Sequence, residues 1–299
     1  MIAAGLLLPT AVLLGNPNLL ASASIDDVER LLGQLLLIAL GGLLLLAGLV
    51  TNAVRAVIVR GQLAPERYRG PAVVVLLLLA LIVGTVVALG SGETALALLD
   101  GGDLSILGTL ILLTSTQIGL LTVTGALIVA PKALAGLRLT PPSGAARSML
   151  IGLALAVPAW VAATVLAAVA AIALEAIGFT QEAGVADTVL ARGDPTVVLV
   201  AFIVVAPAAE ELFFRGVVYN AWLRERGPRI ALFGSAALFA IIHTSLFALV
   251  PIFALGVSLA IVYRRTGSLL AAMAMHAGFN AISVGITLLD RLGILSLPT

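Results

Sequence analysis

The chain has 299 residues, of which 61% are hydrophobic and 10% charged, and its mean hydropathy is +1.20. Soluble domains carry about 25% charged residues, so this composition excludes a soluble globular protein and indicates a polytopic membrane protein. Without cysteine, disulfides and thiolate chemistry are excluded, and a metal could be bound only by His, Asp or Glu. The net charge of +1 and the lack of a Lys/Arg-rich tract leave nucleic-acid binding without an electrostatic basis.

The first predicted element is a short apolar run over residues 1–14, which contains Pro9 and has no basic segment before it. A cleaved signal peptide is therefore a weak interpretation, and an interfacial or partial span fits as well. From Leu31 onward, apolar runs long enough to cross about 30 Å of hydrocarbon, or paired shorter runs, recur to the C-terminus. We predict an all-α fold with about eight transmembrane helices, near residues 31–52, 71–90, 104–130, 148–177, 195–223, 229–246, 248–263 and 268–289.

The charges between these spans alternate in sign, which gives a prediction of topology. Arginine and lysine gather in four connections, within residues 55–69, 132–147, 224–229 and 264–265. Acidic residues gather between them, within residues 26–29, 93–103 and 182–194. Because cytoplasmic loops are enriched in Lys and Arg, both termini are expected on the non-cytoplasmic side. The division of 229–263 is the weakest step, since Pro251 could mark a partly re-entrant hairpin.

We divide the chain into an N-terminal transmembrane region of about four helices, residues 1–194, and a catalytic core, residues 195–299. In the first region, small residues such as Gly41, Gly42 and Gly48 are expected to let helices approach closely. Its role is not indicated by the sequence. The polar run 114–117, Thr-Ser-Thr-Gln, has two interpretations: side chains bonded to their own or a neighbouring helix, or side chains that line a substrate cavity.

All the unusual polar residues of the core belong to three short patterns. These are Glu210-Glu211-x-x-x-Arg215, Phe239-x-x-x-His243 and His276-x-x-x-Asn280. Residues four apart share one face of a helix, so each pattern directs its groups one way. At a rise of about 1.5 Å per residue, Glu210, His243, His276 and Asn280 share a layer near the bilayer middle, open more readily from the cytoplasmic side. Ionisable groups at this depth are costly and usually serve function.

The spacing also predicts different roles for the two glutamates. Arg215 can neutralise Glu211, four residues earlier, as a buried ion pair, and so orients the glutamate pair. Glu210 faces about 100° away without an obvious cation, and burial disfavours its charged form, which suits a general base that activates water. His243 can hydrogen-bond the same water.

The remaining motif residues complete this prediction. His276 and Asn280 can direct donors at a developing oxyanion. We expect Phe239 to pack and thereby to orient the helix of His243. Such a set supports water attack on a peptide carbonyl.

The three patterns, in this order on successive helices and with Thr266-Gly267-Ser268-Leu269 before the last, resemble the CPBP family of intramembrane proteases, named for CAAX processing and bacteriocin processing and also called Abi. The resemblance covers about 190–285. It implies an α-helical glutamate-type endopeptidase in which Glu210 and His243 activate water while His276 and Asn280 form the oxyanion hole. No metal cofactor is implied.

Two alternatives remain. Glu210, His243 and His276 could bind zinc with one position open, although a His-Glu-x-x-His segment is absent. The polar layer could instead serve a transporter or an immunity protein without proteolytic activity.

The expected partners are the lipid bilayer and a membrane-associated or lipidated peptide or protein. The Ala/Leu/Val-rich composition is typical of a prokaryotic protein, so a multi-pass protein of the cell membrane is expected, and the physiological substrate is left open.

Overall fold

The computed structural model describes residues 25–63, 67–90, 106–129, 144–181, 190, 194–243, 245–291 and 293–294. All regular structure in these ranges is helical, which confirms the all-α prediction. The apolar run 1–14 lies outside the described residues, as do most of the acidic segments 93–103 and 182–194 and the first part of the basic segment 132–147.

The eight predicted helices are all present. The first four are α3 (Ile25–Arg60), α4 (Val73–Gly90), α6 (Ile106–Val129) and α7 (Ala145–Ala176). A fifth runs from Pro195 to Arg226 in several parts, and it is followed by α12 (Pro228–Ile241), α13 (Leu246–Thr266) and α14 (Leu269–Arg291). Six are long and apolar enough to cross a membrane, while α4 and α12 are shorter apolar helices, so the chain is a multi-pass membrane protein.

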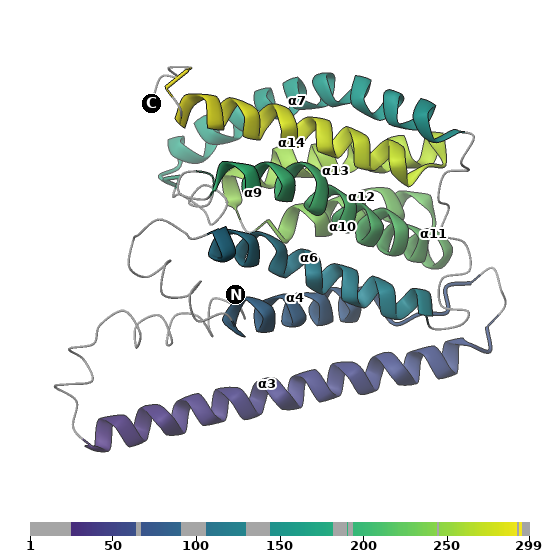
Figure 1. Ribbon diagram of the computed structural model, residues 1–299. Helices are drawn as coiled ribbons and strands as arrows, with labels where there is room; N and C mark the ends of the chain where they lie inside the picture. The colour runs from purple at the N-terminus through teal and green to yellow at the C-terminus, as the bar shows by residue number, and fades with distance from the viewer. Residues whose placement is uncertain are drawn as a thin grey trace.

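Helix α3 lies along the outside of the bundle (Figure 1) and, where its side chains are described, is exposed along most of its length. The prediction that Gly41, Gly42 and Gly48 bring helices together is wrong, because a Cβ added at any of them would meet nothing within 4 Å. The apolar surface of α3 suits contact with lipid instead. Its C-terminal end is attached to the core by an ion pair of 2.6 Å between Arg60 and Glu225, which places their basic segments at the same end of the bundle.

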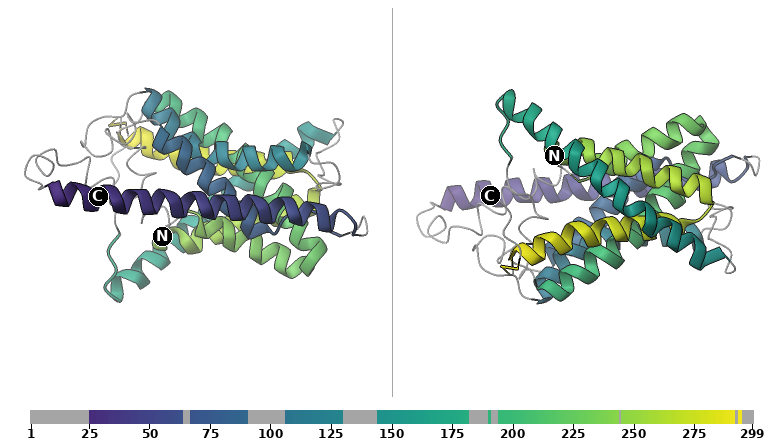
Figure 2. Two further views of the ribbon diagram at one scale, coloured as in Figure 1. Left: turned by 90° about the horizontal axis from the view of Figure 1, so that it is seen from below. Right: turned by 90° about the horizontal axis from the view of Figure 1, so that it is seen from above.

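Close helix contacts depend on other glycines. In α4 and α6, a Cβ at Gly84 would lie 2.8 Å from the Ser115 carbonyl oxygen, and one at Gly119 would collide with the Ala80 carbonyl oxygen. Helix α7 crosses α14 (Figure 2), where a Cβ at Gly152 would collide with the carbonyl oxygen of Ala271. Glycines do let helices approach closely in the N-terminal region. The sequence alone could not show which glycines lie at these contacts.

The boundary between α12 and α13 differs from the prediction. Helix α12 ends at Ile241 rather than at 246, and His243 lies in the turn that follows it. Helix α13 begins at Leu246, where the Ser245 side chain accepts a hydrogen bond from the Ala248 N–H. Pro251 is buried inside α13 and does not interrupt it, so residues Leu246–Thr266 form one continuous helix.

The contact between α4 and α6 can be tested by adding a single methyl group. We expect Gly119→Ala to destabilise the protein by about 1–3 kcal/mol, because the new Cβ collides with backbone that cannot move aside easily. Gly125→Ala is the matched control on the same helix, where a Cβ meets nothing within 4 Å and helix propensity favours alanine. Thermal unfolding in detergent measures both, and equal melting temperatures for the two variants would contradict the packing described.

Candidate active site

The helix that carries the glutamates is not a uniform α-helix. Short α9 (Pro195–Val200) leads into the π-helical η2 (Ala201–Val205), then α10 (Ala206–Glu211), the π-helical η3 (Leu212–Tyr219) and α11 (Asn220–Arg226). Pro207 has no N–H to donate to the carbonyl four residues earlier, which accounts for the altered bonding before α10. The glutamate pair therefore lies between two π-helical segments, a distortion that is frequent at functional sites.

The second π-helical segment is stabilised by a side chain at its end. The Nδ2 group of Asn220 donates to the carbonyl oxygens of Arg215 and Gly216 at 2.9 and 3.0 Å. It also lies 2.8 Å from the hydroxyl of Tyr263 on α13. Backbone acceptors near the end of η3 thus obtain partners, and the segment is fixed to the neighbouring helix.

Arg215 is fully buried and forms the centre of the site. Its Nη1 donates to Oε1 of Glu211 at 2.7 Å, and its Nη2 donates to the carbonyl oxygen of Gly256 at 2.9 Å. The guanidinium carbon lies 4.7 Å from the centre of the Phe239 ring. The ion pair between Arg215 and Glu211 is the one that the spacing predicts.

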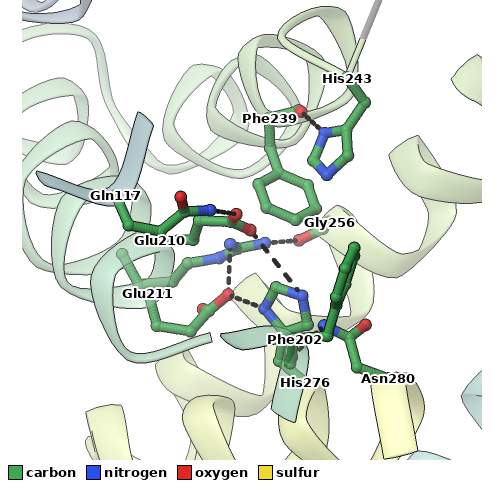
Figure 3. Close-up of polar contacts among 10 residues, drawn as sticks. Gln117, Phe202, Glu210, Glu211, Phe239, His243, Gly256, His276 and Asn280 are labelled. Atoms are coloured by element: carbon green, nitrogen blue, oxygen red, sulfur yellow. Dashed lines mark hydrogen bonds and ion pairs between the residues drawn. The ribbon is translucent and has the colours of Figure 1, made fainter. Parts of the chain in front are cut away.

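His276 lies between the two carboxylates (Figure 3). Its Nδ1 is 3.0 Å from Oε1 of Glu211, and its Nε2 is 3.9 Å from Oε2 of Glu210. An ionised carboxylate only accepts hydrogen bonds, so Nδ1 carries the proton that is shared with Glu211. In the neutral ring, Nε2 is then an acceptor on the side of Glu210.

Glu210 has a different environment from its neighbour. It is 7% exposed, and its Oε1 accepts a hydrogen bond of 3.3 Å from Nε2 of Gln117 on α6. No arginine or lysine pairs with it in the described part of the chain. Sequence analysis missed Gln117 as a site residue, although it belongs to the polar run 114–117, because nothing in one sequence shows which helices become neighbours.

Phe239 separates His243 from the buried ion pair, as Figure 3 shows. The centre of its ring lies 4.8 Å from the ring of His243 and 5.6 Å from that of His276, and it packs edge-on against Phe214 at 5.2 Å. The Nδ1 of His243 is 2.7 Å from the Phe239 carbonyl oxygen, which only accepts, so Nδ1 is the protonated nitrogen. Nε2 of a neutral His243 is therefore an acceptor without a hydrogen-bond partner among the described residues.

Asn280 holds α14 against the first π-helical segment. Its Nδ2 donates to the carbonyl oxygen of Phe202 at 2.8 Å, which uses one of its two N–H groups. The structure thus brings Glu210, Glu211, Arg215 and His276 into one buried cluster, in which Glu211 is hydrogen-bonded to Arg215 and His276 while Glu210 lies 3.9 Å from His276. His243 and Asn280 lie beside that cluster and have separate backbone partners.

This fold and site define a multi-pass membrane protein with buried carboxylate and imidazole groups inside its helical bundle. Residues 192–282 match the family model described as type II CAAX prenyl endopeptidase, Rce1-like. This segment includes all three motifs, so the resemblance to the CAAX-processing proteases is confirmed over these residues. No similar protein was found among curated proteins or among solved structures.

The buried ion pair gives a prediction of stability. We expect Arg215→Met to lower the free energy of unfolding by about 3–5 kcal/mol, because Glu211 keeps a buried charge without its cation. Arg215→Lys should be intermediate, since one ammonium cannot reproduce the planar fork that reaches both Glu211 and Gly256.

The control is Arg229→Met, which removes an exposed arginine at the start of α12. Unfolding of the four proteins would be followed in the same detergent. Equal losses for Arg215→Met and Arg229→Met would contradict a structural role for the buried pair.

Proposed function

We propose that this protein is an intramembrane endopeptidase in which Glu210 is the general base that activates water. The observation that carries the proposal is the unequal pairing of two adjacent glutamates. Glu211 shares its charge with Arg215, whereas Glu210 has a neutral amide as its donor. A carboxylate without a bound cation keeps its ability to accept a proton from water. The match to a family of endopeptidases supports the same reaction class.

His243 is proposed to help orient that water. Because its Nδ1–H is used by the Phe239 carbonyl, its unprotonated Nε2 can accept a hydrogen bond. His243 is only half-buried, in the turn after α12, where water can reach it more readily than the buried Glu211. Phe239 sets the position of this ring through both its carbonyl and its own ring.

The proposed reaction has two steps. The water oxygen attacks the peptide carbonyl carbon as Glu210 takes one of its protons, and the carbonyl oxygen becomes an oxyanion. The C–N bond then breaks, the carbonyl re-forms, and the proton held by Glu210 passes to the departing amine nitrogen.

Asn280 is proposed to donate its second N–H to the oxyanion, with His276 as the other donor through Nε2 when its ring is protonated. Glu211 would stabilise that protonated ring from the opposite side, through Nδ1. Removal of one such donor typically lowers turnover by about 10²–10³.

The proposed substrate is a peptide or protein held at the membrane. The apolar helices around the site favour a substrate that is delivered from the bilayer, and the matched family suggests a prenylated C-terminal segment. The basic segments that contain Arg60 and Arg224 mark the end of the bundle that we assign to the cytoplasm, so the site is proposed to open toward that side. The abundance of Ala, Leu and Val leads us to place the protein in a prokaryotic cell membrane.

Glu210→Gln should lower cleavage by about 10²–10⁴-fold while the protein still inserts and folds, because the amide keeps the shape of the side chain but cannot take a proton. The matched control is Glu175→Gln, which makes the same change at an exposed position near the end of α7. Membranes that contain each variant would be compared by proteomics of new peptide termini, and a purified assay would use matched prenylated and unprenylated peptides. Full activity of Glu210→Gln would refute the proposal.

The zinc alternative makes a different prediction. Among the residues that the structure describes, no three His, Asp or Glu side chains are grouped so that they could hold a metal ion together. His243 is directed to the Phe239 carbonyl, and no bond within the described residues joins it to Glu210 or His276. We therefore propose catalysis by the side chains alone. Elemental analysis should find less than one zinc per active protein and chelators should leave cleavage unchanged, whereas stoichiometric zinc with loss of activity on chelation would favour the metalloenzyme.

A further inference from the structure

Gln117 lies on α6, far outside the family-matched segment 192–282, yet it contacts the proposed base. Its Nε2 lies 3.3 Å from Oε1 of Glu210 (Figure 3), and the residue is buried, with 9% of its surface exposed. Helix α6 packs against α10, which carries Glu210, and against η3. The N-terminal region therefore supplies a side chain to the site.

The orientation of the Gln117 amide follows from the chemistry of its partner. An ionised carboxylate accepts hydrogen bonds but donates none, so the NH₂ group of Gln117 must face Glu210. Its carbonyl oxygen, Oε1, then has no hydrogen-bond partner among the described residues.

The neighbours of Gln117 behave differently. The hydroxyl of Thr114 donates to the Leu110 carbonyl at 2.7 Å, and that of Ser115 donates to the Leu112 carbonyl at 3.3 Å. Both bonds remain within α6, as is usual for hydroxyls in membrane helices. Gln117 is thus the member of the run whose bond crosses to the glutamate helix.

The two glutamates also receive different kinds of donor. Glu211 is bonded by the cation of Arg215, which fixes it and offsets its charge. Glu210 is bonded by an amide, which fixes the carboxylate without adding a positive charge. A cation at the position of Gln117 would favour the ionised carboxylate so strongly that the carboxylate would accept a proton from water less readily.

We propose that Gln117 is a positioning residue that holds the Glu210 carboxylate through a neutral hydrogen bond and so makes α6 part of the catalytic unit. This inference rests on the proposed function of Glu210. Gln117 holds Oε1 and leaves Oε2 on the side of His276, 3.9 Å from Nε2. Its free amide oxygen is available to a water or to a substrate N–H.

The test compares three variants of the full-length protein in the peptide assay. Gln117→Met keeps the length of the side chain but removes the donor, so kcat should fall about 10- to 100-fold with KM within about two-fold, as expected for a lost hydrogen bond to a charged group. Gln117→Lys keeps a donor but adds a charge, and kcat should also fall. Thr114→Val removes a hydroxyl bonded within α6, and kcat should remain that of the wild type.

The melting temperature of each variant is measured in parallel. If Gln117 only joins α6 to α10, a different pattern of kcat values is expected. In that case kcat per folded molecule stays unchanged in Gln117→Met, and Gln117→Lys retains activity because it still links the helices. Either result would overturn the proposal. If the wild type shows no cleavage that depends on Glu210, the proposed function fails instead.

A second measurement does not require activity. A membrane-permeant carbodiimide reacts with protonated carboxyl groups, and mass spectrometry locates the adduct. Loss of the Gln117 donor leaves the ionised Glu210 less stabilised, so labelling at Glu210 should increase several-fold in Gln117→Met and remain unchanged in Thr114→Val. Equal labelling of Glu210 in the wild type, Gln117→Met and Thr114→Val would contradict the proposed role of the bond from Gln117 to Glu210.

Discussion

The site depends on one buried cation. Arg215 donates to Glu211 on α10 and to the Gly256 carbonyl on α13, and its guanidinium lies over the ring of Phe239 on α12. A buried charge is strongly unfavourable without partners, so the three helices must stay together around it. Gly256 permits this approach, because a Cβ there would lie 3.0 Å from the Cα of Ala236 on α12.

This constraint gives two chemically identical neighbours different roles. Glu211 accepts bonds at Oε1 from both Arg215 and His276, so its charge is already offset by a cation. Glu210, one residue earlier on α10, meets the amide of Gln117 and lies 3.9 Å from His276. The proposed chemistry follows from this difference: the engaged carboxylate orients the site, and the other is left to accept a proton. The N-terminal region takes part through α6 and through α7, which packs against α14.

The sequence was sufficient to predict features that repeat or are local. Hydropathy located all eight helices, and the i,i+4 spacing predicted the pair of Glu211 with Arg215. Features that depend on which helices become neighbours could not be predicted from the sequence. Gln117 has no local signal that distinguishes it from Thr114, and Gly119 none that distinguishes it from Gly41. The π-helical segments beside the glutamates arise from Pro207 and from the bonds of Asn220, which a uniform 3.6-residue helix does not anticipate.

The central claim is that Arg215 neutralises the buried charge of Glu211, while Glu210 is the reacting carboxylate. A double-mutant cycle measures this directly, with Glu211→Gln, Arg215→Met and the double variant compared for stability and for cleavage that requires Glu210. Removing both charges together leaves neither one buried alone. The double variant should therefore be more stable than either single variant and should retain measurable cleavage. A double variant that is as unstable as the sum of the two single losses, or that has no cleavage although it is folded, would contradict this division of roles.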